Sequence, residues 1–342
     1  MKIGIVTVYD GVSNIGSYLQ AYAMQLALEK LGHQVFFVEK TSVPKCIWQH
    51  VARMNPKRAF FLRLRSGWNY FLASRKFRFI KPDQAAKKLD CLLFGSDEIW
   101  NMDNPFFKDP LFFGTGYNVP KIAYAVSVGA MEQTTLDQNL DIVAGVRDFS
   151  TILARDDRTR TMMGQLLNGE LPLVCDPTLL VGKSALQQPI KLPSKKYILV
   201  YSYGLDQGMI DNIRKFAKEK ELQIVSAHFW HHFCDQTISC TPLQFSPLMA
   251  GAEYVFTSTF HGAIFAMLNH TRCVIMPVRD KVRDIAVRMG QGDRLIDPDA
   301  DYSTFCDKIC KEFSVVEFEA LLNDAQRNSQ KMLEDALTCL TN

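Results

Sequence analysis

The chain has 342 residues, of which 47% are hydrophobic and 22% charged, and its formal net charge at pH 7 is +3. This length fits two domains of ordinary size, and the composition is typical of a soluble globular protein. The small net charge gives no support to nucleic-acid binding, so no nucleic-acid partner is expected.

The N-terminal residues 3–9 form a predicted strand and not a signal peptide, because their apolar part is short and polar Asp10 follows at once. No run reaches the roughly 18 apolar residues of a membrane-spanning helix. The nine cysteines include no CxxC pair, and Cys306 and Cys310 are spaced as on one helix face, which suits packing better than zinc. Free thiols are typical of a reducing compartment, so we expect a cytoplasmic protein, with peripheral attachment at the inner face of the membrane left open.

The first half of the chain alternates between predicted strands and helices. Residues 18–31 are rich in strong helix formers, Gly32 ends that helix, and a strand at 35–38 follows. Such a β-α-β unit implies parallel strands joined by a right-handed crossover. Further strands are predicted at 89–94, 121–128, 150–154 and 171–175.

Prolines and lysines predict a linker at 189–196, after which the alternation restarts. The predicted elements are then a strand at 197–203, a helix at 209–221, a strand at 223–229, a helix at 242–250, a strand at 253–258, a helix at 262–269 and a strand at 272–278. We therefore predict an α/β protein with two doubly wound Rossmann-like domains facing a cleft. The expected domains are 1–188 and 197–314, and a C-terminal helix within 315–342 would pack across them.

The segment Thr257-Ser258-Thr259-Phe260-His261-Gly262 joins a predicted strand to a predicted helix. This layout directs backbone N–H groups and the positive helix end at an anion. A histidine at that point can transfer a proton near pH 7. A buried histidine bonded to a neighbouring strand is the alternative, but the hydroxyls, the glycine and the helix start together favour a site.

Two other predicted strands end in functional side chains. The turn Gly95-Ser96-Asp97-Glu98-Ile99-Trp100-Asn101 carries carboxylates suited to a general base or a sugar-hydroxyl acceptor, and an indole suited to a sugar face. Its alternative is an Asp N-cap with the tryptophan in the core. Arg155 follows the strand at 150–154, where a guanidinium suits phosphate or carboxylate. Its alternative is a surface ion pair with the neighbouring aspartates.

Weaker signals lie elsewhere. The loop 10–17 has neither a GxGxxG nor a Walker pattern, and Asn14 there is as well explained by helix capping as by ligand binding. Asp176 precedes a proline, which favours a turn. The run 228–234 offers metal-capable histidines, but no second cluster has suitable spacing, so aromatic packing is favoured and no metal is expected.

Residues 40–82 contain eleven Lys and Arg residues, no Asp or Glu, and many interleaved aromatic residues. This pattern resembles a basic, aromatic surface that lies on anionic lipid. A basic helical rim that is merely solvated is an equally good interpretation.

Six segments in chain order resemble the motifs of the polysaccharide pyruvyl transferase family, namely 14–23, 95–101, 124–129, 155–156, 176–180 and 258–262. The resemblance covers most of the chain and implies a glycosyltransferase-B-like fold with two Rossmann-like domains. It also implies transfer of the enolpyruvyl carbons of phosphoenolpyruvate to a sugar, giving a pyruvate ketal. Such a reaction belongs to exopolysaccharide or capsule biosynthesis, acts on free or lipid-linked oligosaccharide, and requires no cofactor besides phosphoenolpyruvate as co-substrate.

The resemblance further implies that His261 and Arg155 bind phosphoenolpyruvate, His261 being the catalytic acid–base candidate. Our hypothesis adds Asp97 as a base or an anchor for the acceptor. The expected acceptor side of the N-terminal domain is formed by Asn14, Gln20, Ser96, Glu98, Trp100 and Asn101.

Some relatives carry arginine where this chain has Thr259. Thr259 and Gly262 would then line the donor site, with the missing phosphate contact supplied by Lys281 or Arg283. Two alternatives stay open: a nucleotide-sugar-dependent glycosyltransferase of the same fold, and a non-catalytic sugar-binding protein.

Overall fold

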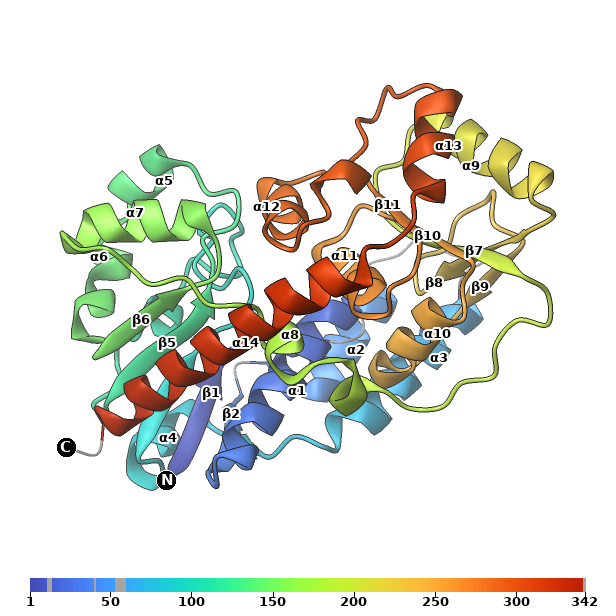
Figure 1. Cartoon of the computed structure of the whole chain (residues 1–342). Helices are drawn as coiled ribbons and strands as arrows, with labels where there is room; N and C mark the ends of the chain where they lie inside the picture. The colour runs from blue at the N-terminus through green and yellow to red at the C-terminus, as the bar shows by residue number, and fades with distance from the viewer. Residues whose placement is uncertain (11–13, 40, 53–59, 341–342) are drawn as a thin grey trace. The chain divides into compact units, whose positions relative to one another are not determined.

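The computed structural model describes residues 1–10, 14–39, 41–52 and 60–340 (Figure 1). Its contacts divide the chain into two compact units. The first comprises Met1–Cys46, Ser74–Val181 and Asp324–Asn342, and the second comprises Ile47–Ala73 and Gly182–Asn323. The expected domains follow the chain in order, whereas the units interleave, because residues 47–73 join the second unit.

The first unit contains a six-stranded parallel sheet in the order β3-β2-β1-β4-β5-β6. Its strands are β1 (Lys2–Val6), β2 (Gln34–Val38), β3 (Phe79–Ile80), β4 (Cys91–Phe94), β5 (Lys121–Val126) and β6 (Thr151–Ala154). This is the doubly wound order, in which the progression of the chain across the sheet reverses between β1 and β4. Every residue of β4 and β5 is buried, as expected for parallel strands covered on both faces.

The helices of the first unit begin and end at recognisable signals. Asp156 caps α7 by accepting from the Thr159 N–H at 2.9 Å, and Asn168 ends it in the left-handed conformation. The helices are α1 (Ile15–Lys30), α4 (Pro82–Lys88), α5 (Gln133–Asp137), α6 (Leu140–Val143), α7 (Asp157–Leu167) and α8 (Pro177–Val181).

One predicted strand is not formed. Residues 171–175 make only an isolated bridge, between Leu173 and Ala154. Pro172 has no N–H to donate to a ladder, and the Cys175 N–H donates instead to Ser329 Oγ at 2.8 Å. The segment therefore leaves the sheet edge after one residue. The other strands predicted in this half of the chain are present with boundaries shifted by a few residues.

The second unit contains a five-stranded parallel sheet in the order β11-β10-β7-β8-β9. Its strands are β7 (Tyr197–Tyr201), β8 (Gln223–Ala227), β9 (Gln236–Ile238), β10 (Tyr254–Thr257) and β11 (Cys273–Ile275). The progression across this sheet reverses between β7 and β10, so the second sheet is doubly wound as well. The strand β9 was not predicted.

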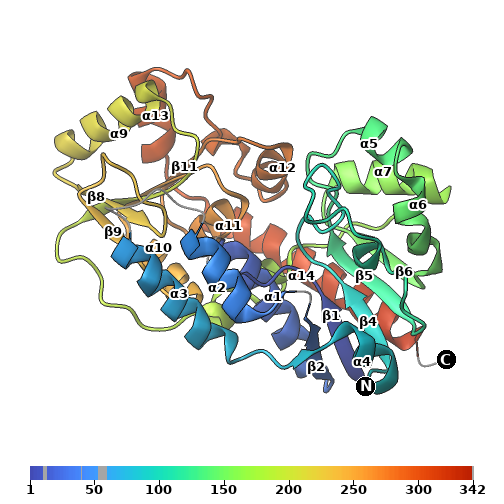
Figure 2. The ribbon, with the colours of Figure 1, turned by 180° about the vertical axis from the view of Figure 1, so that it is seen from behind.

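The helices packed in this unit include α9 (Gln207–Glu219), α10 (Phe245–Ala250), α11 (Phe260–Leu268), α12 (Asp280–Arg288) and α13 (Tyr302–Cys310). Helices α9 and α13 lie side by side in both views (Figures 1 and 2). The helix α13 contains Cys306 and Cys310, in agreement with their predicted placement on one helix.

The basic stretch 40–82 contains two further helices, α2 (Val43–Ala52) and α3 (Phe60–Ser74), although its residues 40 and 53–59 lie outside the described ranges. Helix α3 is held to the second unit near the end of β9. Ser66 Oγ lies 3.0 Å from Ser239 Oγ, and Asn69 Nδ2 donates to the Ser239 carbonyl at 3.2 Å.

The predicted C-terminal helix is α14 (Val315–Thr338). Its residues up to Asn323 belong to the second unit and those from Asp324 onward to the first. Among the helices of the described ranges, none combines the length and the apolar character that a membrane crossing needs.

Candidate functional site

The carboxyl ends of β1 and β4 meet at the switch point of the first sheet, the position where doubly wound proteins bind ligands. Thr7 follows β1, and Ser96 and Asp97 follow β4. Thr7 Oγ1 donates to the Ser96 carbonyl at 2.8 Å, which joins the two loops across the switch point. The structure therefore places the predicted 95–101 turn at the ligand-binding edge of its sheet.

Gly95 and Asp97 give this turn an unusual backbone. Gly95 has a φ of +115°, and a Cβ there would lie 2.1 Å from the Tyr124 carbonyl oxygen, so only glycine fits. Asp97 has a φ of +79°, a left-handed conformation that is uncommon for a residue with a side chain. Backbone conformations of this kind concentrate at functional sites, where the surrounding structure holds them.

The first turn of α1 contributes to the same switch point. Asn14 is exposed, and its Oδ1 accepts from the Gly16 N–H at 2.9 Å, which is the capping role given as its alternative. Ser17 Oγ donates to Asp97 Oδ2 at 3.0 Å. The start of α1 thus orients the Asp97 carboxylate.

Gln20, one turn further along α1, is fully buried. Its Nε2 donates to the Val8 and Ser17 carbonyls at 2.6 and 2.8 Å. Its Oε1 accepts from Ser96 Oγ at 3.1 Å. With both ends of its amide engaged inside the protein, Gln20 supports the turn from beneath instead of lining an acceptor surface.

Arg155 follows β6 and is only 3% exposed, so it is not in the surface ion pair given as its alternative. Its Nη1 lies 3.3 Å from Asp176 Oδ2, and its Nη2 lies 3.8 Å from Asp97 Oδ1. Burial by itself lowers the pKa of Arg155, but the carboxylates of Asp97, Asp176, Asp156 and Glu98 outweigh it and raise the pKa above its usual value. Arg155 is therefore a buried, permanently charged group between carboxylates.

Asp176 is the functional-site residue that sequence reasoning assigned to a turn alone. Its Oδ1 does cap a turn, accepting from the Thr178 N–H at 3.0 Å and from Thr178 Oγ1 at 2.7 Å. Its Oδ2 contacts Arg155 Nη1 and accepts from Ser96 Oγ at 3.4 Å. The available signal was its position directly after an apolar segment.

Trp100 belongs to the hydrophobic core and not to the expected acceptor surface. Its side chain is fully buried, its Nε1 donates to the Phe112 carbonyl at 2.9 Å, and its ring stacks on Phe113 at 6.0 Å. The neighbouring Asn101 Nδ2 donates to Glu98 Oε2 at 3.1 Å, and both residues are buried. After Asp97 the turn enters the hydrophobic core, to which Ile99, Trp100 and Met102 belong.

The switch point of the second sheet, between β7 and β10, has a similar cross-link. Ser202 Oγ, after β7, donates to Ser258 Oγ, after β10, at 2.8 Å. Thr257 Oγ1 donates to the Tyr201 carbonyl at 2.7 Å. The predicted 257–262 turn therefore also lies at the ligand-binding edge of its own sheet.

Thr259 caps helix α11, its Oγ1 accepting from the Gly262 N–H at 3.0 Å. A Cβ on Gly262 would lie 2.1 Å from Thr257 Oγ1 and 2.5 Å from Thr259 Oγ1. Gly262 is thus required for close packing of the two hydroxyls. His261 is in the first turn of α11, is 5% exposed, and its ring stands perpendicular to that of Phe260 with centroids 5.2 Å apart.

The two candidate cations beyond this turn differ in placement. Lys281 Nζ lies 5.2 Å from the ring centroid of Phe260, which places its ammonium group beside the turn. Arg283 has a side chain that is more than half exposed, and its Nη2 lies 3.9 Å from Asp297 Oδ1. Lys281 is therefore the better placed partner for an anion at the start of α11.

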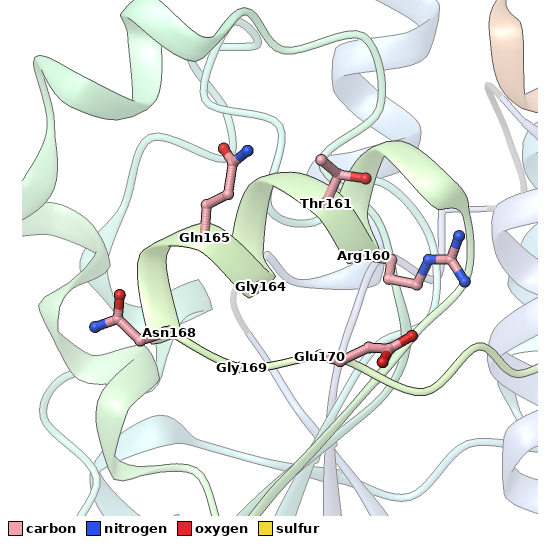
Figure 3. A pocket seen from close by; sticks show the side chains of 7 residues that line it. All are labelled: Arg160, Thr161, Gly164, Gln165, Asn168, Gly169 and Glu170. Carbon is pink, nitrogen blue, oxygen red and sulfur yellow. The ribbon is translucent and has the colours of Figure 1, made fainter.

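The structure thus forms two groups of candidate residues. Asp97, Arg155, Ser96 and Gln20 come together in the first unit, and Thr259, His261, Gly262 and Lys281 in the second. A surface hollow beside α7, lined by Arg160, Gln165, Glu170 and their neighbours, contains none of these residues (Figure 3). Within the described residues, no group of three or more His, Cys, Asp or Glu side chains is arranged to hold a metal ion.

A family model described as polysaccharide pyruvyl transferase matches residues 14–280. The match spans both switch-point turns and ends directly before Lys281. No curated protein matches the chain in sequence.

Several solved structures share the fold at low sequence identity. The UDP-GlcNAc 2-epimerase from Neisseria meningitidis, bound to UDP-GlcNAc, is 13% identical, with 100% of each chain covered and a TM-score of 0.54. The UDP-GlcNAc 2-epimerase from Methanocaldococcus jannaschii is 11% identical, with 99% of this chain and 100% of that chain covered and a TM-score of 0.53. Spinosyn forosaminyltransferase SpnP is 10% identical, with 100% of each chain covered and a TM-score of 0.51. These similarities confirm the predicted fold class, an α/β fold of glycosyltransferase-B type with two parallel-sheet domains.

Proposed function

This chain belongs to the polysaccharide pyruvyl transferase family, and on that premise we propose that it transfers the enolpyruvyl group of phosphoenolpyruvate to a sugar. The acceptor would be a lipid-linked oligosaccharide or a polysaccharide, and the product a cyclic pyruvate ketal of a surface polysaccharide. One observation carries this proposal: the family match at 14–280 includes both switch-point turns, 95–101 and 257–262.

The proposed reaction needs an acid, a base and cations. A proton is added to the methylene carbon of phosphoenolpyruvate, which becomes a methyl group and leaves an oxocarbenium-like C2. One sugar hydroxyl adds to C2, inorganic phosphate leaves with its bonding electron pair, and a second hydroxyl closes the ketal. The two sugar hydroxyls release two protons. One replaces the proton that was added to the methylene carbon, and the other protonates the departing phosphate or a base.

His261 is the proposed acid–base group. It is in the first turn of α11, where backbone N–H groups and the positive helix end favour an anion. Lys281 would add a cation for the phosphate or carboxylate of the donor, since its ammonium group lies beside the ring of Phe260. These placements support donor binding at the second switch point.

Asp97 is the proposed base or acceptor anchor of the first unit. Ser17 fixes one of its carboxylate oxygens, and the Glu98 N–H donates to the other at 2.9 Å. Arg155 is assigned to donor binding by the family resemblance. Its burial between Asp97 and Asp176 supports a second role, which is to hold the Asp97 carboxylate in its orientation.

The test is a donor screen with the full-length protein. Phosphoenolpyruvate and an oligosaccharide acceptor are incubated with the protein, and phosphate release and product mass are followed together. Phosphate release with a gain of one pyruvate ketal supports the proposal. Sugar transfer from a nucleotide sugar would replace it with a glycosyltransferase, and binding without turnover would replace it with a sugar-binding protein.

Two variants test the roles. We expect His261→Asn to reduce turnover at least about 10²-fold, as for loss of an acid–base group. His270→Asn is the matched control, because His270 follows the other end of α11 and bonds Glu319 at 2.7 Å. Equal losses in both variants, or near-normal turnover in His261→Asn, would exclude the acid–base role.

A further inference from the structure

Helix α3 presents large apolar side chains to solvent instead of burying them. Phe61 is 82% exposed and Trp68 is 60% exposed, and the rings of Trp68 and Phe71 stack with centroids 5.7 Å apart. The outward face of α3 consists of six exposed residues spaced three or four apart: Phe61, Leu64, Arg65, Trp68, Phe71 and Leu72. This spacing places them on one stripe of the helix.

The opposite face of α3 is packed against the protein, and apart from Tyr70 its buried residues are polar or small. Ser66, Tyr70 and Ser74 are buried there. Ser66 and Asn69 bond Ser239, which fixes the rotation of the helix about its axis. Gly67 permits close packing on α2, since a Cβ at Gly67 would lie 3.0 Å from Ile47 Cγ2.

The amphipathic pattern of α3 is therefore reversed relative to that of an ordinary surface helix, whose apolar stripe faces the core. Contiguous exposed apolar patches on soluble proteins mark binding surfaces. Helix α3 lies beside α10 of its own unit in both views (Figures 1 and 2). The six residues of its outward face are all exposed.

The charge around this face indicates the partner. Arg65 lies within the stripe and is exposed, and Arg75 follows directly after the helix and is exposed as well. Residues 40–82 contain no acidic residue. Trp, Phe and Leu combined with Arg are the side chains of helices that lie in the plane of a membrane interface, where apolar groups enter the acyl boundary and cations meet anionic headgroups.

We propose that the outward face of α3 docks this protein on an anionic lipid bilayer, with Phe61, Trp68, Phe71 and Leu72 inserted into the interface. A second copy of the chain fits this face less well. In a two-fold dimer the same stripe meets itself, so Arg65 of each copy would lie against a surface without acidic residues to neutralise it.

Docking does not depend on the proposed catalytic activity. It would bring the protein to the surface that carries a lipid-linked acceptor, and only that consequence rests on the proposed function. The docking experiment therefore contains neither phosphoenolpyruvate nor sugar, and its outcome is separate from that of the donor screen.

The test is co-sedimentation of the full-length protein with vesicles of phosphatidylcholine alone or mixed with phosphatidylglycerol. We expect binding to the mixed vesicles that weakens as salt increases. The double substitution Trp68→Ser with Phe71→Ser should weaken this binding by at least about tenfold. Arg65→Gln should weaken it by roughly fivefold at low salt.

Two controls separate docking from misfolding. Val316→Ser changes an exposed apolar residue of α14 that is 84% exposed, and it should leave vesicle binding unchanged. Trp68→Phe should keep vesicle binding but reduce the quenching of tryptophan fluorescence by lipids with brominated acyl chains. Thermal unfolding of every variant should match that of the unsubstituted protein, because the substituted side chains are exposed.

Absence of binding to the mixed vesicles would overturn the proposal, and so would binding that the double substitution does not change. A third outcome is a dimer that forms without lipid and is abolished by the double substitution, with no binding to vesicles. In that case the outward face would bind a second copy of the chain. Lysate proteins captured by this face without vesicle binding would equally overturn the lipid assignment.

Discussion

Arg155 and Asp176 form an ion pair that is closed to solvent on both sides. Their Nη1 and Oδ2 atoms are 3.3 Å apart, and the two side chains are 2% and 0% exposed. The same guanidinium lies 3.8 Å from Asp97 Oδ1, so one cation connects the ends of three chain segments at the edge of the first sheet. Removal of the Arg155 guanidinium would leave the buried carboxylates of Asp97 and Asp176 without their neighbouring positive charge.

Arg155→Met should therefore lower the free energy of unfolding by about 3–5 kcal/mol, as for a broken buried ion pair. The measurement is urea denaturation followed by circular dichroism. The matched control is Arg160→Met, since Arg160 pairs with Asp157 at 2.6 Å in a surface contact. That change should cost less than about 1 kcal/mol. Similar losses for the two variants would contradict the buried pair.

Gly262→Ala should destabilise the second unit by about 1–3 kcal/mol, because the added methyl group meets the Thr257 and Thr259 hydroxyls. Gly169→Ala is the control, since no atom lies within 4 Å of a Cβ at that position. Thermal unfolding of both variants checks the prediction. A Gly262→Ala protein as stable as its control would show that the turn accommodates the added methyl group without loss of stability.

Trp100→Ala should act on stability and not on acceptor recognition. Deletion of a fully buried indole costs about 3–5 kcal/mol, and it would also leave the Phe112 carbonyl without its donor. The measurements are urea denaturation and, in an active preparation, the KM for the acceptor. A raised KM with unchanged stability would return Trp100 to the acceptor surface.

His231 should make stability depend on pH. Burial, and to a lesser extent the charge of His232, lowers the pKa of His231 from its usual 6.5, while the Ser202 carbonyl opposes the change. As the pH falls below 6.5, His231 binds a proton in the unfolded chain but stays neutral in the folded protein, because its pKa there is lower. The free energy of unfolding therefore decreases. The melting temperature measured from pH 7.5 to about pH 5 should fall less steeply in His231→Asn than in the unsubstituted protein. Parallel curves would assign the pH dependence to other groups.

Cys339 should react first with a thiol reagent. It is exposed, whereas Cys240 is buried and burial raises the pKa of its thiol to about 12. In native protein at pH 8, Cys339→Ser should remove one thiol from the fast phase of reaction with a chromogenic disulfide, while Cys240→Ser should leave that phase unchanged. A smaller fast phase in Cys240→Ser would show that the Cys240 thiol is readily accessible to the reagent in the native protein.

The sequence predicted the fold well where local signals and burial agree. Apolar runs ended by polar turns located most strands, and strong helix formers followed by Gly32 located α1. The strand predicted at 171–175 was wrong, although its apolar residues are typical of a strand. The Cys175 N–H donates to Ser329, and only the folded structure shows that Ser329 lies there. Tertiary partners of this kind are not visible in local sequence.

The sequence predicted where Asp97 and His261 lie in the fold but not what the candidate residues contact. The sequence placed Asp97 and His261 at strand ends, and the structure places both at switch points. It did not reveal that Trp100 turns into the core or that Asp176 meets Arg155, because both depend on which strands become neighbours. The pairing of α3 with Ser239 was equally hidden, since those residues are far apart in the chain.

The first unit is assembled from three separate parts of the chain, and its last part begins at Asp324. During synthesis on the ribosome, its six strands are all present once Ala154 has emerged, yet the hydroxyl of Ser329 that receives the Cys175 N–H is made far later. The contact between Cys175 and Ser329 can therefore form only after the entire second sheet has been translated. Until then the first unit is incomplete, so a chaperone that binds the partly folded chain should affect the yield of folded protein more than it would for a chain whose domains close one after the other.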